Sequence, residues 1–251
     1  MNTLRVFQWL SGKENQSAFL GGIGMDDNSQ VLDDLVKKDG VITAFSWNKC
    51  HPTGHCIALV EGEERTLCAR LGAAEHYSCE DLWSQSNKEH LENAKVVYIE
   101  GYFLFHSFEA VMEVANYTKS MNIPLMINLS GEYVCKDVAY VKNVIKLLPY
   151  VNFIFGNASE FNVFLETVKE KLEVRPTVID NLLRQIDPAR TDAENEIQTS
   201  AVDTNLKAIV TDGSNPVTCF SLATPIQTFS VDVPCMSKDL IKVLFEAFEK
   251  F

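Results

Sequence analysis

Strand-sized apolar runs recur through the centre of the chain, at 95–99, 124–129, 152–155, 207–211 and 217–221. Stretches with apolar residues at helical spacing lie between the first four runs, at 107–121, 138–148 and 158–172. A rhythm of strand, helix and strand is typical of a parallel sheet whose two faces are covered by helices. The pattern therefore predicts an α/β fold built on a doubly wound, mostly parallel sheet.

Residues 41–71 have a shorter rhythm than the central part of the chain. Three runs with alternating polarity, at 41–47, 56–61 and 65–70, are joined by tight polar turns. These connections are too short for helical crossovers. The pattern predicts a small β-sheet that covers the mouth of the α/β domain as a lid, and an ordinary antiparallel edge is the alternative.

The last third of the chain contains two segments of different character. Residues 177–204 are polar, acidic and poor in aromatic side chains, which predicts a helix beside a loop. Residues 238–251 carry Leu, Ile and Phe at helical spacing opposite Lys and Glu, which predicts an amphipathic closing helix. We expect residues 1–251 to form a single domain.

The composition is that of an ordinary globular protein, with 46% hydrophobic and 22% charged residues. Its longest apolar runs have the length of strands, so we expect no membrane span. The net charge of −12 argues against nucleic acid or an anionic membrane as the main partner. If the ligand is a nucleotide, local hydrogen-bond donors or a metal ion must hold its phosphates against this charge.

The seven cysteines include no C-x-x-C pair, and residues 1–10 do not have the pattern of a signal peptide. Scattered thiols without a secretion signal are typical of a reducing compartment. We expect a cytoplasmic protein, with the nucleus as an additional compartment.

Two segments place polar residues directly after strand-sized runs. Asn157 and Glu160 have the spacing of a helix N-cap with a capping box. At the carboxyl end of a parallel strand, the same side chains can instead hold a hydrated Mg²⁺ on nucleotide phosphates. Thr211 and Gly213 follow another strand at the same rim, which suits either a nucleotide contact or a plain strand turn. Both interpretations of each segment stay open at this point.

Two further segments carry weaker signals. Residues 19–26 run from a strand into G-G-x-G, which suits a tight turn or the close approach of a ligand, but is not the full dinucleotide fingerprint. In 51–55, two histidines flank Pro52 and Gly54, with no acidic or Cys partner at ligand spacing. This argues against a zinc site.

Taken together, these segments resemble adenosine kinases of the ribokinase-like family, in the same order and at similar intervals from residue 2 to about 231. The matching stretches are Asn2-Thr3-Leu4-Arg5, Pro52-Thr53-Gly54, Arg65-Thr66-Leu67, Tyr98 to Leu104, Asn128-Leu129-Ser130 and Phe155-Gly156-Asn157-x-x-Glu160. In this family Tyr98 to Leu104 would be a further strand that lines the nucleoside pocket.

The resemblance implies a ribokinase-like fold with a β-lid, and ATP-dependent phosphorylation of adenosine to AMP in purine salvage. It implies adenosine and ATP as small-molecule partners, Mg²⁺ as cofactor and a monomer. Asn157 and Glu160 match the family's magnesium motif, and Asn157, Thr211 and Gly213 match its ATP contacts. The positions that match the nucleoside pocket are Asn2, Leu67, Ala69, Leu71, Tyr102, Phe103 and Tyr133.

The departures from the family pattern fall on its catalytic parts. The family's N-terminal strand, whose Asp holds the ribose hydroxyls, has no counterpart before Asn2. Where the family has Gly-Ala-Gly-Asp, residues 231–239 contain no glycine. Pro234 lacks an N–H group, so this segment cannot point successive amides at a phosphoryl group as glycines do. We expect a chain that is truncated at its N-terminus and divergent at its C-terminus.

Asp239 is the candidate general base of this divergent segment, displaced by one residue. The alternative is an acidic residue in the first turn of a helix, which the helix dipole favours. Three functions therefore stay open: an adenosine kinase, whose rate the missing Gly-Ala-Gly-Asp lowers by several orders of magnitude; a non-catalytic relative that binds a nucleoside or a protein partner; and a sugar kinase of the same family.

Overall fold

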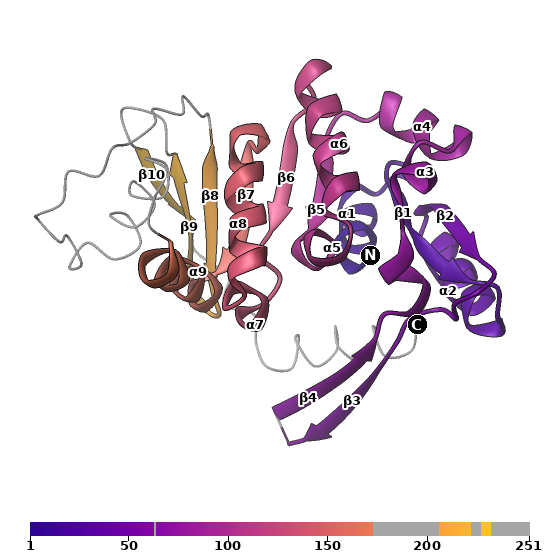
Figure 1. Ribbon diagram of the computed structural model, residues 1–251, viewed down its shortest axis with the longest axis horizontal. Helices are drawn as coiled ribbons and strands as arrows, with labels where there is room; N and C mark the ends of the chain where they lie inside the picture. Colours follow the sequence, from indigo (N-terminus) through magenta and orange to yellow (C-terminus); the bar gives the residue numbers. More distant parts are fainter. Residues whose placement is uncertain (63, 173–205, 222–226, 232–251) are drawn as a thin grey trace, which may run out of the picture. The chain divides into compact units, whose positions relative to one another are not determined.

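The computed structural model describes residues 1–62, 64–172, 206–221 and 227–231 (Figure 1). The chain divides into two compact units, Met1–Asn93 and Ala94–Lys250. Each unit has its own sheet or sheets. The predicted helices in 177–204 and 238–251, and with them Asp239, lie outside the described residues.

The first unit is built around a parallel strand pair and an antiparallel hairpin. Its elements are α1 (Asn2–Ser11), β1 (Ala18–Gly24), α2 (Asp27–Lys38), β2 (Ile42–Asn48), β3 (His55–Glu61), β4 (Glu64–Arg70), the 3-10 helix η1 (Gly72–His76), α3 (Cys79–Leu82) and α4 (Gln85–Glu92). β1 pairs with β2 in parallel, from Ala18 opposite Ile42 to Gly24 opposite Asn48. Helix α2 is the crossover between them, which a parallel connection requires.

The antiparallel part of the predicted lid is shorter than 41–71. The runs at 56–61 and 65–70 form the hairpin β3–β4, in which His55 pairs with Arg70. The run at 41–47 is β2, which pairs with β1 instead of with the hairpin. The 12-residue helix α2 before it supplies the long connection of a parallel pair, and sequence alternation alone did not reveal this partner.

The glycines of 19–26 lie inside strand β1, so they do not form the expected turn. A Cβ on Gly22 would lie 2.6 Å from the carbonyl oxygen of Ala73, and one on Gly24 would lie 2.4 Å from the amide nitrogen of Thr53. Glycine is required here because neighbouring backbone packs directly on the strand.

Asp26 ties the start of α2 to the base of the hairpin. Its carboxylate accepts hydrogen bonds from the Thr53 amide at 2.7 Å, from the Thr53 hydroxyl at 2.7 Å and from the Ser29 amide at 3.0 Å. The bonds from Thr53 lower the pKa of Asp26 below its usual value. Asp26 is therefore the N-cap of α2 and an anchor for residue 53 at the same time.

The second unit contains a six-stranded sheet with the strand order β10-β9-β8-β7-β6-β5. Its strands are β5 (Val97–Glu100), β6 (Leu125–Asn128), β7 (Phe153–Asn157), β8 (Lys207–Asp212), β9 (Asn215–Ser221) and β10 (Gln227–Val231). β5 to β8 are parallel, and β8, β9 and β10 are antiparallel. The predicted parallel core is thus confirmed, extended by an antiparallel edge.

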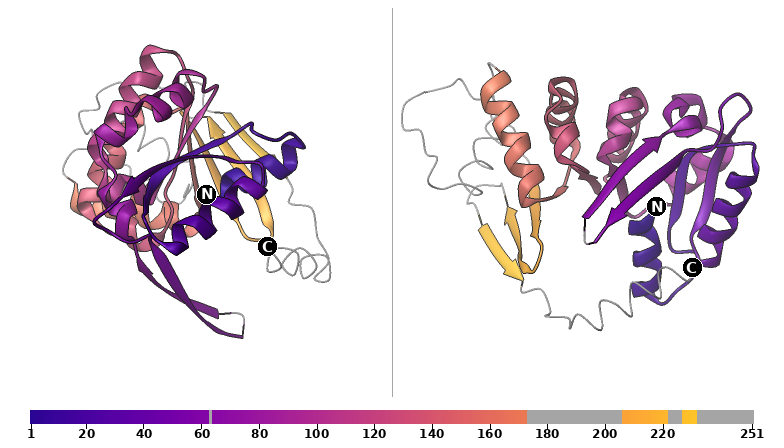
Figure 2. Two further views of the ribbon diagram at one scale, coloured as in Figure 1. Left: turned by 90° about the vertical axis from the view of Figure 1, so that its right-hand side faces the viewer. Right: turned by 90° about the horizontal axis from the view of Figure 1, so that it is seen from below.

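Helices alternate with the parallel strands of this unit. They are α5 (Gly101–His106), α6 (Phe108–Ser120), α7 (Glu132–Cys135), α8 (Val138–Leu147), the 3-10 helix η2 (Leu148–Tyr150) and α9 (Ala158–Lys171). In the described part of this unit, α6, α8 and α9 lie along one face of the sheet (Figure 2). They bury side chains such as Val111, Val141 and Phe161, each at most 1% exposed.

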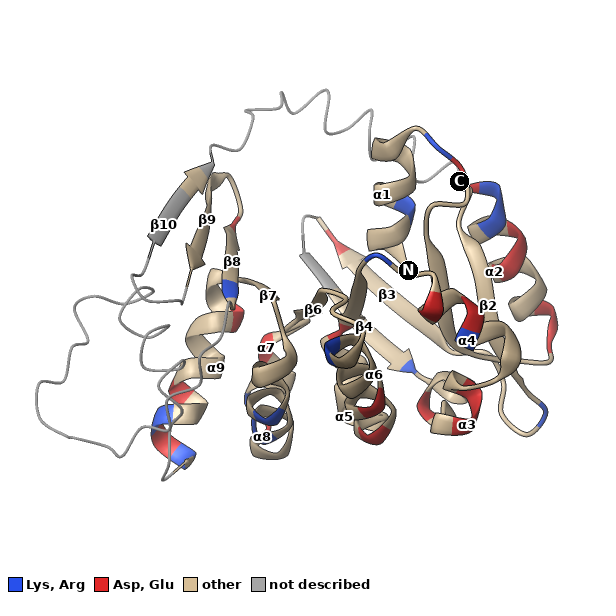
Figure 3. Cartoon of the chain, turned by 90° about the horizontal axis from the view of Figure 1, so that it is seen from above, with Lys and Arg blue, Asp and Glu red and all other residues tan. Residues whose placement is uncertain are grey.

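Charges on the outer faces of the helices follow the helix dipole. Figure 3 shows acidic and basic residues along both α2 and α9. α2 begins with Asp27 and ends with Lys37 and Lys38, and α9 has Lys169 and Lys171 in its last turn. This distribution stabilises both helices modestly. None of the helices in the described ranges is long and apolar enough to span a bilayer.

The stretch from Tyr98 to Leu104 is not one strand, as its resemblance predicted. Strand β5 ends at Glu100, and helix α5 begins at Gly101. Tyr102 and Phe103 therefore lie in the first turn of a helix, directly after the carboxyl end of the strand. A run of aromatic and apolar residues suits either element, so the pattern did not mark this boundary.

Candidate functional site at the carboxyl ends of the parallel strands

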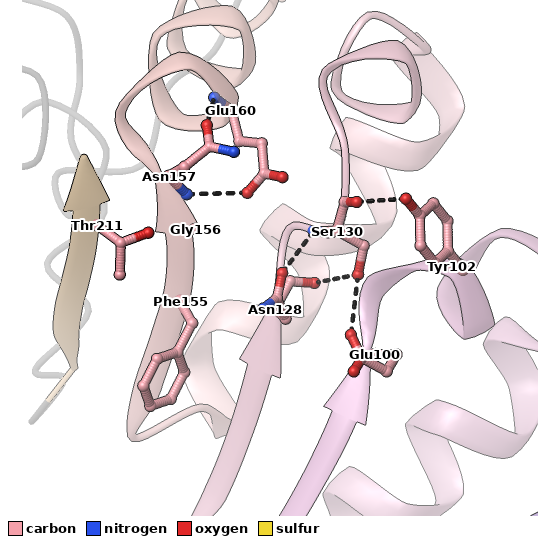
Figure 4. A pocket seen from close by; sticks show the side chains of 9 residues that line it. All are labelled: Glu100, Tyr102, Asn128, Ser130, Phe155, Gly156, Asn157, Glu160 and Thr211. Atoms are coloured by element: carbon pink, nitrogen blue, oxygen red, sulfur yellow. Dashed lines mark hydrogen bonds between the residues drawn. The ribbon is translucent and has the colours of Figure 1, made fainter. Parts of the chain in front are cut away.

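A pocket of about 320 Å³ opens at the carboxyl ends of the parallel strands in the second unit (Figure 4). Its lining residues are Glu100, Tyr102, Asn128, Ser130, Phe155, Gly156, Asn157, Glu160 and Thr211. The strand register brings them together, since Glu100 pairs with Asn128 across β5 and β6. Asn157 pairs with Thr211 across β7 and β8 in the same way. Ligands of open α/β sheets bind at this edge.

Asn157 and Glu160 form a complete capping box at the start of α9. The Asn157 side-chain oxygen accepts a hydrogen bond from the Glu160 amide at 2.8 Å. The Glu160 carboxylate accepts one from the Asn157 amide at 2.9 Å. The predicted cap is confirmed, and the two side chains line the pocket at the same time. The structural and the functional interpretation of this motif are therefore compatible.

Ser130 lines the middle of the pocket. Its backbone has a conformation that is rare for a residue with a side chain, with φ at +68°. Its amide donates to the side-chain oxygen of Asn128 at 2.6 Å. Its hydroxyl oxygen accepts from the Gly101 amide at 2.7 Å, and its carbonyl accepts from the Tyr102 hydroxyl. These bonds hold the strained turn between β6 and α7 in place (Figure 4).

Tyr102 and Tyr133 form an aromatic pair beside this turn. Their ring centroids are 5.9 Å apart, with the planes at 23°. Tyr133 is 69% exposed and Tyr102 is 41% exposed, so part of both rings faces solvent. Burial of its hydroxyl raises the pKa of Tyr102 to about 12. An exposed pair of this kind can stack on a flat ligand such as a purine.

The electrostatic character of the pocket is acidic. Burial, followed by the negative charges of Glu132 and Glu100, raises the pKa of Glu160 above its usual value. Neither Lys nor Arg occurs among the nine described residues that line the pocket. An anionic ligand would therefore meet amide and hydroxyl donors, but no side-chain cation from these residues.

The oxygen donors of the pocket fit a hard divalent cation. Such ions prefer carboxylate, amide and water oxygens, and Mg²⁺ keeps several of its waters. Glu160 and Asn157 offer a carboxylate and an amide oxygen, and the raised pKa of Glu160 is what an uncompensated carboxylate shows. Among the residues that the structure describes, no group of three or more His, Cys, Asp or Glu side chains is placed to hold a metal ion by itself.

The residues expected from the sequence fall into three groups. Asn157, Glu160, Thr211 and Tyr102 line the pocket, whereas Tyr133 stacks on Tyr102 without lining it. Phe103 and Gly213 belong to the same unit but are not lining residues, and Gly213 forms the turn after β8 with φ at +55°. Asn2, Leu67, Ala69 and Leu71 belong to the first unit, so their relation to this pocket stays a prediction.

Five pocket residues were not predicted as site residues: Glu100, Asn128, Ser130, Phe155 and Gly156. Glu100 and Asn128 are each the last residue of a parallel strand. Each is the first polar residue after an apolar run, as Asn157 is after β7. This shared position is the sequence signal that would have found them.

The fold and the pocket define a class of protein: an α/β protein with a polar ligand pocket at the carboxyl ends of parallel strands. The family model that matches residues 1–180 is described as the pfkB family carbohydrate kinase. The chain belongs to this family, and the ribokinase-like fold predicted from its motifs is confirmed.

Several of the relatives that the chain resembles are adenosine kinases. Adenosine kinase 1 of Arabidopsis thaliana is 33% identical over 163 residues, which are 65% of this chain and 47% of that protein. A crystal structure of Anopheles gambiae adenosine kinase in complex with a di(adenosine-5) tetraphosphate has 28% identity and a TM-score of 0.77, covering 95% of this chain and 65% of that one. The chain spans about half the length of the Arabidopsis relative.

A second solved structure supports the fold alone. Schistosoma mansoni adenosine kinase in complex with 2-fluoroadenosine has 22% identity and a TM-score of 0.75, and the match covers 95% of this chain and 65% of that one.

Proposed function

We propose that this chain binds adenosine and ATP and transfers the terminal phosphoryl group of ATP to the adenosine 5′-hydroxyl, as an adenosine kinase. The observation that carries the proposal is the pocket itself, because Asn157 and Glu160 lie together with Thr211 at the carboxyl ends of β7 and β8. The adenosine kinase relatives of Arabidopsis and Anopheles supply the reaction.

The nucleoside half of the proposed site rests on aromatic faces. Tyr102 and Tyr133 present a stacked, half-exposed pair on which a purine ring can lie. By the family resemblance, Asn2, Leu67, Ala69 and Leu71 are further candidates for contact with the nucleoside, where apolar side chains would exclude water.

The phosphate half of the proposed site uses backbone and amide donors around an acidic wall. Asn157 and Glu160 are the residues that would hold Mg²⁺, in part through water, and Mg²⁺ would neutralise charge on the transferring phosphate. Thr211 and the turn at Gly213 would orient the ATP chain beside them. Phosphoryl transfer depends mainly on such positioning and charge stabilisation.

The divergent segment 231–239 bears on the rate of this reaction. Pro234 has no N–H group, the segment has none of the glycines that let amides approach a phosphoryl group closely, and Asp239 is the candidate general base proposed from the sequence. The loss of one anion-stabilising donor lowers a rate about 10²- to 10³-fold. We therefore expect turnover well below that of a typical kinase, which is about 1–100 s⁻¹.

A coupled assay of AMP formation from adenosine and ATP tests the proposal. Slow, Mg²⁺-dependent turnover that falls at least tenfold further in Glu160→Gln is the expected result. The matched control is Glu109→Gln, which removes the same charge from an exposed position on α6 and should leave the rate unchanged. Turnover that is equal in wild type and Glu160→Gln would contradict the assigned role of this pocket.

The second candidate is a relative that binds adenosine without phosphorylating it, and the absence of glycine from 231–239 favours it. It predicts a rise of the melting temperature with adenosine, but no AMP. A sugar kinase is the third candidate, and competition separates it, since an aromatic pocket should bind adenosine more tightly than ribose. We further propose a cytoplasmic monomer with small-molecule partners; size-exclusion chromatography with light scattering tests the monomer.

A further inference from the structure

Glu100 is the most unexpected residue of the pocket. It ends strand β5, two strands away from Asn157 on β7, and it lines the same pocket. Figure 4 shows it on the opposite wall from Glu160, with Asn128 between them. Neighbouring strands lie about 4.8 Å apart, so the backbones of β5 and β7 are separated by about 10 Å.

The carboxylate of Glu100 lies beside the Ser130 turn. Its Oε2 is 3.3 Å from the Ser130 hydroxyl, whose single proton is donated either there or to the Asn128 carbonyl oxygen, which is also 3.3 Å away. The same hydroxyl oxygen accepts from the Gly101 amide at 2.7 Å. Glu100 is half-buried, so solvent screens its charge less than that of a surface carboxylate.

The charge of Glu100 acts across the pocket. Together with Glu132, it raises the pKa of Glu160, after the larger effect of burial, and it also contributes to the raised pKa of Tyr102. Glu132 is exposed and does not line the pocket. Glu100 is therefore the second carboxylate, beside Glu160, that a ligand in this pocket would meet directly.

We propose that Glu100 is a specificity-determining residue, whose carboxylate makes the pocket accept a nucleotide phosphate as its divalent-cation complex and reject the metal-free anion. The inference rests on the proposed function and deepens it. A metal-free diphosphate brings about three negative charges to a wall that already carries Glu100 and Glu160. A bound divalent cation offsets two of those charges, so the complex meets much less repulsion from the two carboxylates.

Glu100 differs from Glu160 in the effect that its removal should have. Glu160 belongs to the capping box and is the proposed cation ligand, so its loss weakens cation binding itself. Removing Glu100 leaves Asn157 and Glu160 in place and takes away only the repulsion of free phosphate. A unit charge about 8 Å from a phosphate in a partly screened pocket changes its affinity on the order of tenfold.

Isothermal titration calorimetry with ADP measures this effect directly. The dissociation constant is determined once with excess MgCl₂ and once with EDTA, for wild type, Glu100→Gln and Glu109→Gln. Glutamine keeps the shape of the side chain and an oxygen for the Ser130 hydroxyl. We expect Glu100→Gln to bind metal-free ADP about tenfold more tightly than wild type does, with less than a threefold change for ADP with Mg²⁺.

The remaining outcomes separate the two proposals. If Glu100→Gln and Glu109→Gln change the metal-free affinity equally, the role of Glu100 is refuted and the nucleotide site stands. If wild type binds ADP in neither buffer, the proposed function and the inference both fail. Thermal unfolding of each variant without ligand verifies that the protein is folded, and Glu100→Ala, which removes the same charge, must change the metal-free affinity in the same direction.

Discussion

The pocket end of the six-stranded sheet and the hairpin β3–β4 differ in how their side chains are held. At the pocket, hydrogen bonds such as those of Ser130 and Asn157 fix the polar side chains before any ligand is present. On the hairpin, every described residue of β3 is exposed, and Ile57, Leu59 and Leu67 are 58–66% exposed. A sheet of two strands has no core of its own.

The difference shows where each region obtains its stability. The strands that carry the pocket pack against helices α8 and α9, each of which has a row of buried side chains. The hairpin is held by its own backbone bonds and by its base, where Thr53 binds Asp26. Substitutions beneath the pocket should therefore lower the stability of the protein, while those on the exposed hairpin should change it little.

The largest effect is expected from Phe164→Ala. This side chain on α9 is fully buried, so its removal leaves a cavity and costs about 3–5 kcal/mol of unfolding free energy. The counterpart on the hairpin, Leu59→Ala, should change stability by less than about 0.5 kcal/mol. Urea unfolding followed by circular dichroism measures both. Similar losses in the two variants would show that the hairpin is packed as well as the core is.

A smaller loss is expected from Gly101→Ala, directly after the pocket residue Glu100. The added Cβ would lie 2.3 Å from the Asn128 carbonyl oxygen and 2.4 Å from the Tyr140 hydroxyl, so backbone must move. Overpacking of this kind costs about 1–3 kcal/mol. The control is Gly21→Ala in β1, whose Cβ would meet only the Phe19 ring at an ordinary 3.5 Å. A Gly101→Ala protein as stable as this control would refute the close packing.

The same two regions show what the sequence can predict. Amphipathic periodicity predicted α6, α8 and α9 to within about two residues, because each buries one continuous face against the sheet. Capping chemistry predicted the start of α9 at Asn157, since both bonds of the box are local. These features depend on residues that are close in the sequence.

Features that depend on distant partners were predicted less well. The pairing of β2 with β1 and the packing of backbone on Gly22 are set by contacts between remote segments, which leave no local pattern. Glu100 is an intermediate case: its place after the apolar run of β5 is a local signal, but the register of β5 against β6 is what brings it beside Asn128. Tyr102 was predicted as a pocket residue by its resemblance, although its helix was not.

Two substitutions of Asn157 separate helix capping from ligand binding. The first, Asn157→Ala, should lower the free energy of unfolding by about 1 kcal/mol. Alanine removes the acceptor for the Glu160 amide, and a lost N-cap has this typical cost. Asn157→Ser keeps a capping oxygen but shortens its reach into the pocket. We expect Asn157→Ser to unfold close to wild type and yet to bind ADP with Mg²⁺ several-fold more weakly. Equal ADP affinity in wild type and Asn157→Ser would show that Asn157 caps the helix but does not contribute to ligand binding.

The smallest effect concerns the pH dependence of the pocket wall. The pKa of Glu160 is raised in the folded state, so the protonated form is favoured by folding. The stability that protonated Glu160 contributes is fully present below the ordinary pKa of about 4.5. It is lost as the pH rises through the raised pKa of the folded state. Glu160→Gln, which keeps the capping geometry, should therefore gain stability relative to wild type between pH 4 and pH 7.

Urea unfolding of wild type and Glu160→Gln at pH 4, 5, 6 and 7 measures this gain, which should stay below about 1 kcal/mol because solvent screens the half-exposed carboxylate. Glu109→Gln on α6 gives the background of an exposed charge. The same comparison can be made in the Glu100→Gln background, with and without Glu160→Gln. The pH-dependent difference should be smaller there, because one of the charges that oppose ionisation of Glu160 is gone. If the stability difference between wild type and Glu160→Gln is the same at all four pH values, the pocket does not raise the pKa of Glu160.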